Sequence, residues 1–137
     1  MTNNTSKHIL LIEDDLFIRE LYERTLTQDG FTVSTGIDGE EGGAKAISEK
    51  PDLILLDIMM PKKNGIDVLK DLKASNTTKN IPVFLLTNLG QESIIKEAFS
   101  MGAAGYLLKA RLLPRDVCAH IVAFFETGVV PTELTQL

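Results

Sequence analysis

The stretch Leu53-Ile54-Leu55-Leu56-Asp57 places a carboxylate directly after four aliphatic residues. A run without polar alternation is typical of a strand buried on both faces, as in a parallel sheet that lies under helices. In open α/β sheets, ligands bind in the crevice beyond the carboxyl ends of the strands. The stretch therefore predicts a parallel α/β fold with Asp57 at a candidate site.

Three further apolar runs also end in polar groups. Residues 9–12 lead into Glu13-Asp14-Asp15, residues 83–86 into Thr87, and residues 106–108 into Lys109. Together with a short run over 31–35, they alternate with helical patterns at 16–28, 39–49, 66–72, 92–101 and 114–127. Five such units predict a doubly wound sheet with helices on both faces, in which all strands end at one edge.

Composition limits the class of protein. The chain has 137 residues, 44% of them hydrophobic, which suits one domain with a real core. A net charge of −5 without a basic stripe argues against direct binding of nucleic acid or an anionic membrane. The single cysteine, Cys118, fits a reducing cytosol, and no apolar run approaches the ~20 residues of a membrane span. We expect a cytoplasmic protein with one domain over 1–127 and a short tail over 128–137.

The polar strand ends form a chemically coherent set. Crowded carboxylates such as Glu13, Asp14 and Asp57 hold either protons or a cation, and all-oxygen ligands favour Mg²⁺, Mn²⁺ or Ca²⁺ over zinc. An Asp carboxylate can also act as a nucleophile toward phosphorus, and a metal, a lysine and a hydroxyl would neutralise the transferring group. Each residue alone has a simpler reading, such as a helix cap or a surface lysine, so the prediction rests on their convergence.

Taken in order, these segments resemble the receiver domains of two-component response regulators over about residues 7–127. The resemblance rests on residues 9–15, on 53–61 followed by Gly65, and on Thr87 and Lys109. Tyr106, three residues before the lysine, matches the position of an aromatic switch residue. The resemblance implies a flavodoxin-like (βα)5 fold with strand order 2-1-3-4-5.

The family's roles carry over by position. The resemblance implies that Asp57 accepts a phosphoryl group from a sensor histidine kinase or a phosphotransfer protein. Asp14 and Asp57 would bind Mg²⁺ directly, together with the backbone carbonyl of Met59, and Glu13 would act mainly through metal-bound water.

The remaining roles concern the phosphoryl group and the output. Thr87 and Lys109 would hold phosphoryl oxygens, and Thr87 and Tyr106 would form the switch. A downstream protein partner would then meet the face built by the fourth helix, the fifth strand and the fifth helix. We interpret the chain as a stand-alone receiver whose only catalysis is its own phosphorylation and slow self-dephosphorylation.

Four positions depart from the common pattern or tune it. The family often has Pro after the lysine with a cis peptide bond, and this chain has Ala110. A cis Lys109–Ala110 bond would cost ~3 kcal/mol, so the loop either stores that strain or takes a different path. Asn88 stands where Ala or Gly is common in the family, and its larger side chain would narrow access to the phosphoryl site. Met59 and Leu89 flank the place of the hydrolytic water, and neither can orient water, so we expect a long-lived phosphoryl group.

Two other functions compete with this interpretation. A pseudo-receiver would bind partners without phosphorylation, but such sequences usually lose an acidic, Asp or Lys position that this chain keeps. A phosphatase with an Asp nucleophile, of the haloacid-dehalogenase type, would need a second Asp two residues later, where Met59 stands.

Overall fold

The computed structural model describes residues 7–130, in which the apolar runs form one parallel sheet with five strands in the order β2-β1-β3-β4-β5. The elements alternate along the chain as β1 His8–Ile12, α1 Leu16–Gln28, β2 Thr32–Gly36, α2 Gly39–Glu49, β3 Leu53–Leu56, α3 Gly65–Ala74, β4 Val83–Thr87, α4 Glu92–Ser100, β5 Gly105–Leu108 and α5 Pro114–Thr127. The predicted fold class and strand order are confirmed.

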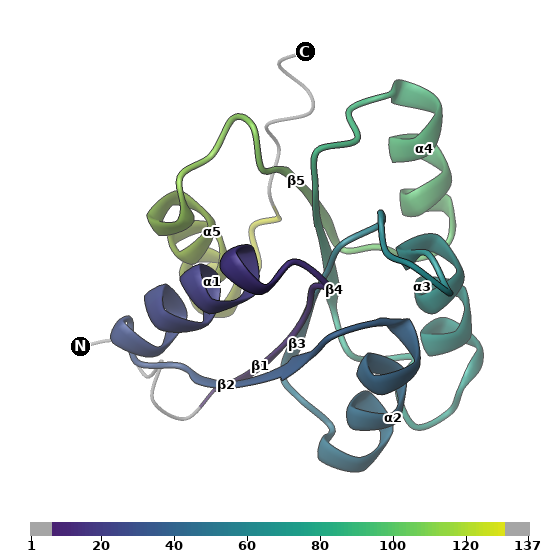
Figure 1. The fold of residues 1–137 in the computed structure, drawn as a ribbon, viewed down its shortest axis with the longest axis horizontal. Helices are drawn as coiled ribbons and strands as arrows, with labels where there is room; N and C mark the ends of the chain where they lie inside the picture. Colours follow the sequence, from purple (N-terminus) through teal and green to yellow (C-terminus); the bar gives the residue numbers. More distant parts are fainter. Residues whose placement is uncertain (1–6, 131–137) are drawn as a thin grey trace.

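Helices cover both faces of the sheet. Figure 1 shows α1 and α5 on one face and α2, α3 and α4 on the other. Neighbouring residues of a strand point to opposite faces, so Leu53 and Leu55 pack with α1 and α5, whereas Ile54 and Leu56 pack with the other three helices. Both faces need apolar side chains, which explains why the central strands have no polar alternation.

The strand register ends β1 and β3 level with each other and carries β4 and β5 two residues further toward the same edge. Ile12 of β1 pairs with Leu56 of β3, and Leu56 pairs with Leu85 of β4. Thr87 at the end of β4 pairs with Leu108 of β5. The residues that follow β1, β3 and β5 therefore leave the sheet side by side at its carboxyl edge.

Polar side chains fix the start of three helices next to that edge. Asp15 caps α1 by accepting a hydrogen bond from Ile18 N at 3.0 Å. Asp38 caps α2 in the same way. Asn64 caps α3 and accepts from Asp67 N at 3.0 Å. Each cap satisfies a backbone donor that the helix cannot pair internally, and together the caps define where the edge loops end.

Cys118, the membrane-spanning potential of the helices and the ends of the chain were also subjects of the sequence predictions. Cys118 is buried, and burial raises the pKa of its thiol to about 12, which makes it an inert packing group. No helix in the described part of the chain is long and apolar enough to cross a membrane. The predicted domain, 1–127, includes residues 1–6, and the predicted tail, 128–137, includes residues 131–137. Both of these end segments lie outside the described residues.

Substitution by alanine should lower stability at Gly65 and raise it at Gly43. A Cβ on Gly65 would lie 2.2 Å from the Asp57 carbonyl oxygen and 2.7 Å from Ile58 Cα, whereas one on Gly43 would meet nothing within 4 Å. We expect Gly65→Ala to lower the free energy of unfolding by about 2 kcal/mol through overpacking. Gly43→Ala, in the interior of α2, should raise it by up to ~1 kcal/mol through helix propensity.

Urea denaturation of both variants measures the two changes. Equal effects of the two substitutions would show that Gly65 is not required by the close approach of the loop after β3.

Candidate functional site

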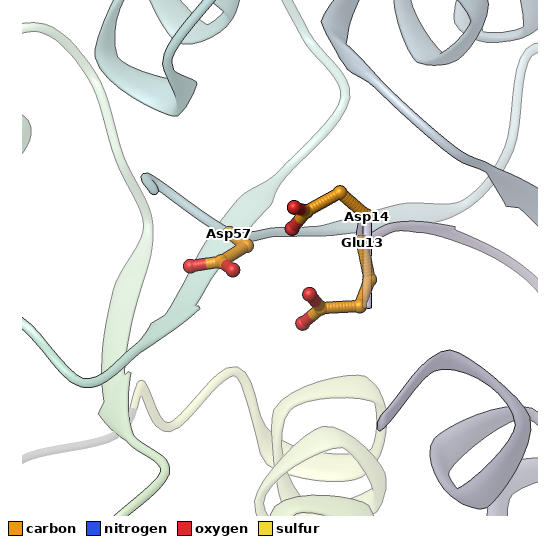
Figure 2. Close-up of side chains that lie close together, drawn as sticks. All are labelled: Glu13, Asp14 and Asp57. Atoms are coloured by element: carbon orange, nitrogen blue, oxygen red, sulfur yellow. The ribbon is translucent and has the colours of Figure 1, made fainter. Parts of the chain in front are cut away.

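Three carboxylates meet at the carboxyl edge of the sheet. Glu13 and Asp14 follow β1, and Asp57 follows β3. One oxygen of each lies within 4.8 Å of the others. Figure 2 shows the carboxyl groups of Glu13 and Asp14 extending toward the side on which Asp57 lies. Glu13 is 1% and Asp57 6% exposed, whereas Asp14 is exposed, so the cluster opens to solvent on the Asp14 side.

Lys109 brings a positive charge to the same place from the end of β5. Its Nζ lies 2.5 Å from Glu13 Oε1 and 3.2 Å from Asp57 Oδ2. Its backbone N donates to the Thr87 carbonyl at 2.9 Å, which continues the pairing of β4 with β5 beyond the strand. The Lys109–Ala110 bond is trans, as is every peptide bond within 7–130. The loop thus takes the different path that the sequence left open, and Lys109 still reaches Asp57.

The electrostatics of the cluster are unbalanced, because one ammonium faces three carboxylates. Burial raises the pKa of Glu13 from its ordinary value of 4.5 to about 7. The hydrogen bond from Lys109 opposes this shift, and the charge of Asp57 adds to it. Burial by itself would lower the pKa of Lys109, but the hydrogen bond to Glu13 and the charge of Asp57 outweigh burial and raise it. Lys109 therefore stays charged, whereas Glu13 binds a proton readily.

Arg19 supports the acidic loop and was missed in the sequence. Its Nη1 donates to the Glu13 carbonyl at 2.9 Å and to the Asp14 carbonyl at 3.3 Å. Arg19 lies near the start of α1, and helical side chains point back toward the N-terminus. An arginine at this distance after an acidic run was the available signal. Asp15, whose carboxylate caps α1, also donates from its backbone N to Glu13 Oε2 at 3.2 Å.

The predicted switch residues meet at Leu89, in the loop between β4 and α4. Thr87 is fully buried, and its Oγ1 accepts a hydrogen bond from Leu89 N at 3.4 Å. Tyr106 is also fully buried, and its hydroxyl donates to the Leu89 carbonyl at 2.6 Å. Both side chains therefore hold the backbone of the same residue from two sides. The Thr87 hydroxyl engages this loop, whereas Lys109 engages Asp57.

Met59 borders the cluster on the other side. Its backbone N donates to Asp57 Oδ1 at 3.3 Å, and its side chain is 61% exposed. Asn88 is exposed at the same edge. The phosphoacceptor candidate Asp57 is thus oriented by a backbone donor and an ammonium, and an apolar side chain lies beside it.

This arrangement supports two kinds of chemistry. Three carboxylates offer only oxygen ligands, which is the donor set that hard divalent cations prefer. A buried carboxylate held by a lysine and a backbone N–H is also positioned as a nucleophile. The same lysine would offset the negative charge of the product.

Comparisons with known proteins agree with this geometry. The family model described as response regulator receiver domain matches residues 9–121. Over 101 residues the chain is 42% identical to the DNA-binding dual master transcriptional regulator RpaA of Synechocystis, covering 74% of this chain and 42% of that protein. It is 34% identical over 110 residues to the chemotaxis protein CheY of Treponema pallidum, covering 78% and 75%.

Solved structures show the same likeness. The CheX–CheY complex of Borrelia burgdorferi with beryllofluoride and magnesium matches with a TM-score of 0.80 and 29% identity, covering 87% of this chain and 89% of that one. The chain spans about half the length of several curated relatives, from 42% to 54% of them.

The raised pKa of Glu13 predicts how stability depends on pH without metal. The unfolded carboxyl ionises near its ordinary pKa of 4.5 and the folded one near 7, so the folded state keeps a proton that the unfolded state loses between these values. The free energy of unfolding should therefore fall as pH rises through this window, by up to about 3 kcal/mol.

Urea denaturation in a chelator at several pH values tests this, with Glu13→Gln as the control. The variant cannot ionise at this position, so its stability should fall less over the same window. Parallel curves for the two proteins would assign the pH dependence to other groups.

Proposed function

The chain belongs to the response regulator receiver family, and on that premise we propose that it is a signalling switch phosphorylated on Asp57. The observation that carries the proposal is the contact of Lys109 Nζ with Asp57 Oδ2 at 3.2 Å inside a cluster of three carboxylates. A structural ion pair alone would need no further acids. The crowding of Glu13 and Asp14 around it is explained if the cluster serves a cation and a phosphoryl group.

In the proposed transfer, a carboxylate oxygen of Asp57 attacks the phosphorus of a phosphohistidine on a sensor kinase or phosphotransfer protein. An O–P bond forms while the N–P bond breaks, and the donor imidazole leaves with the electron pair and takes up a proton. Lys109 offsets charge on the phosphoryl oxygens, because its Nζ already lies beside Asp57. The hydroxyl of Thr87, whose oxygen accepts from Leu89 N in this structure, would donate its own hydrogen to a phosphoryl oxygen.

Mg²⁺ fits the donor set of the cluster. Asp14 and Asp57, with the carbonyl of Met59, would hold the ion directly, and Glu13 would act through bound water. When bound, the ion supplies positive charge to phosphoryl oxygens. Glu13 would give up its proton on binding, because a cation favours the ionised carboxylate.

The switch would run through the loop after β4. In this structure Thr87 and Tyr106 hold Leu89 by its N–H and its carbonyl. A phosphoryl oxygen on Asp57 would accept a hydrogen bond from the Thr87 hydroxyl, and a turn of this side chain toward Asp57 would weaken its bond with Leu89 N, one of the two bonds that fix the loop. A coupling of only ~1–3 kcal/mol would shift the populations of two loop states. We propose that a downstream protein reads the change at the face formed by α4, β5 and α5.

Phosphorylation should occur only at Asp57 and should depend on the acidic cluster. Treatment with acetyl phosphate and Mg²⁺ should add one phosphoryl group to the wild type and none to Asp57→Asn, as measured by intact-protein mass. Asp14→Asn removes a proposed ligand and should slow the modification by about tenfold or more.

Asp15→Asn is the matched control for Asp14→Asn. It removes the same charge from the same acidic run, and Asn caps a helix as well as Asp. The Asp15→Asn variant should therefore be phosphorylated at nearly the wild-type rate. Equal modification of Asp57→Asn and the wild type would contradict the proposal.

The phosphoryl group should be long-lived, because water needs a side chain to orient it in line with phosphorus. Met59 and Leu89 are apolar and border Asp57 and the loop after β4. Replacing both, as Met59→Asn with Leu89→Glu, should speed phosphate loss by about tenfold or more. The measurement is release of inorganic phosphate from the purified phosphoprotein with time.

Met59→Leu keeps the site apolar and should leave the lifetime close to that of the wild type. Loss of phosphate from the wild type within seconds, or slower loss from the polar pair, would refute the role of the two apolar side chains in the lifetime of the phosphoryl group.

A further inference from the structure

An open groove of about 770 Å³ lies beside the phosphoacceptor, on the face of the sheet covered by α3 and α4. Its apolar lining consists of Ile58, Met59, Met60, Pro61, Ile66, Leu89 and Ile94. Met59 is 61% exposed, and Ile66, Leu89 and Ile94 are half-buried. Exposed methionine is typical of adaptable binding surfaces, because its flexible side chain fits different partners.

The charged residues that line the groove are all acidic. Its lining includes the carboxylates of Asp14, Asp67 and Glu97 and no basic residue. Three lysines that lie nearby in the sequence pair with acids outside this lining. Lys62 pairs with Asp38, Lys63 with Asp71, and Lys96 with Glu92. The acidic rim of the groove is therefore not neutralised by these lysines.

We propose that this groove binds a partner segment that carries aliphatic side chains flanked by lysine or arginine. Aliphatic groups would cover Met59, Leu89 and Ile94, and the cationic groups would meet Asp67 and Glu97 at the rim. An amphipathic helix presents this combination on adjacent positions. Charge complementarity selects such a segment over a neutral or acidic one.

The groove shares residues with the phosphorylation site, so occupancy and phosphorylation should be coupled; this step rests on the proposed function. Asp14, Met59 and Leu89 belong to both. Relative to the site with Mg²⁺ alone, a phosphoryl group adds negative charge beside the groove and so favours a cationic segment. In return, a segment over Met59 and Leu89 would further exclude water from the phosphoryl group.

The probe is a synthetic helical peptide with leucines at i, i+3, i+4 and i+7 and lysines elsewhere, titrated into the 137-residue chain by fluorescence anisotropy. Glu97→Lys should weaken its binding by about fivefold or more, because it replaces attraction by repulsion. Glu126→Lys, the same change at an exposed position of α5 outside the groove, should weaken it by less than about twofold. The same peptide with glutamates in place of lysines should not bind measurably.

Equal weakening by the two variants, or equal affinity for the glutamate peptide, would overturn the groove as the site. NMR chemical shifts should change at Ile94 and Leu89 on titration. If these signals instead change with protein concentration in the absence of peptide, a second copy is the occupant and the proposal is wrong.

Beryllofluoride with Mg²⁺ tests the coupling. Compared with the same concentration of Mg²⁺ alone, it should raise the affinity of the wild type for the lysine peptide by about threefold and leave that of Asp57→Asn unchanged. Unchanged affinity in wild type that has bound beryllofluoride would overturn the coupling. If beryllofluoride does not bind to the wild type at all, the phosphorylation proposal fails, and the titration of the unmodified protein still decides the groove.

Discussion

The contact of Lys109 with Glu13 and Asp57 joins the ends of the first, third and fifth strands, which are far apart in the sequence. It forms only because β1, β3, β4 and β5 are parallel and in a register that ends all of them at the same edge of the sheet. Carboxylates this deeply buried are costly unless a cation faces them. The sheet register and the charge balance are therefore one constraint, and the loops at this edge are arranged around it.

Much of the fold could be predicted, because the aliphatic runs must fill both faces of the sheet. The predicted ranges of α1, α2 and α5 agree with the structure. The second strand was predicted at 31–35 and runs from Thr32 to Gly36, because Phe31 turns into the core and Gly36 pairs with Ile12. The fourth helix ends at Ser100, one residue early, because Met101 serves as its C-cap.

Topology alone could predict that the charged side chains of the site meet. Glu13, Asp57 and Lys109 each directly follow a strand, and Asp14 follows Glu13. The hydrogen bonds within the site could not. Asp15 belongs to the same acidic run as Asp14, yet its side chain caps a helix, because the chain turns between them. Whether Thr87 engages Asp57 or Leu89 depends on loop conformation, which hydrophobic pattern does not encode. The roles of these residues in phosphorylation stay predictions.

Leu89 links the parts of the molecule that the proposals treat separately. Its N–H is held by Thr87, its carbonyl by Tyr106, and it also lines the acidic groove. Any event that moves this residue must alter the site and the groove together, since Leu89 belongs to both. A partner bound in the groove would thus act on the Thr87 hydrogen bond without touching Asp57. Under the two proposals, this geometry would let a signal pass in either direction, as the reciprocity of coupled binding sites requires.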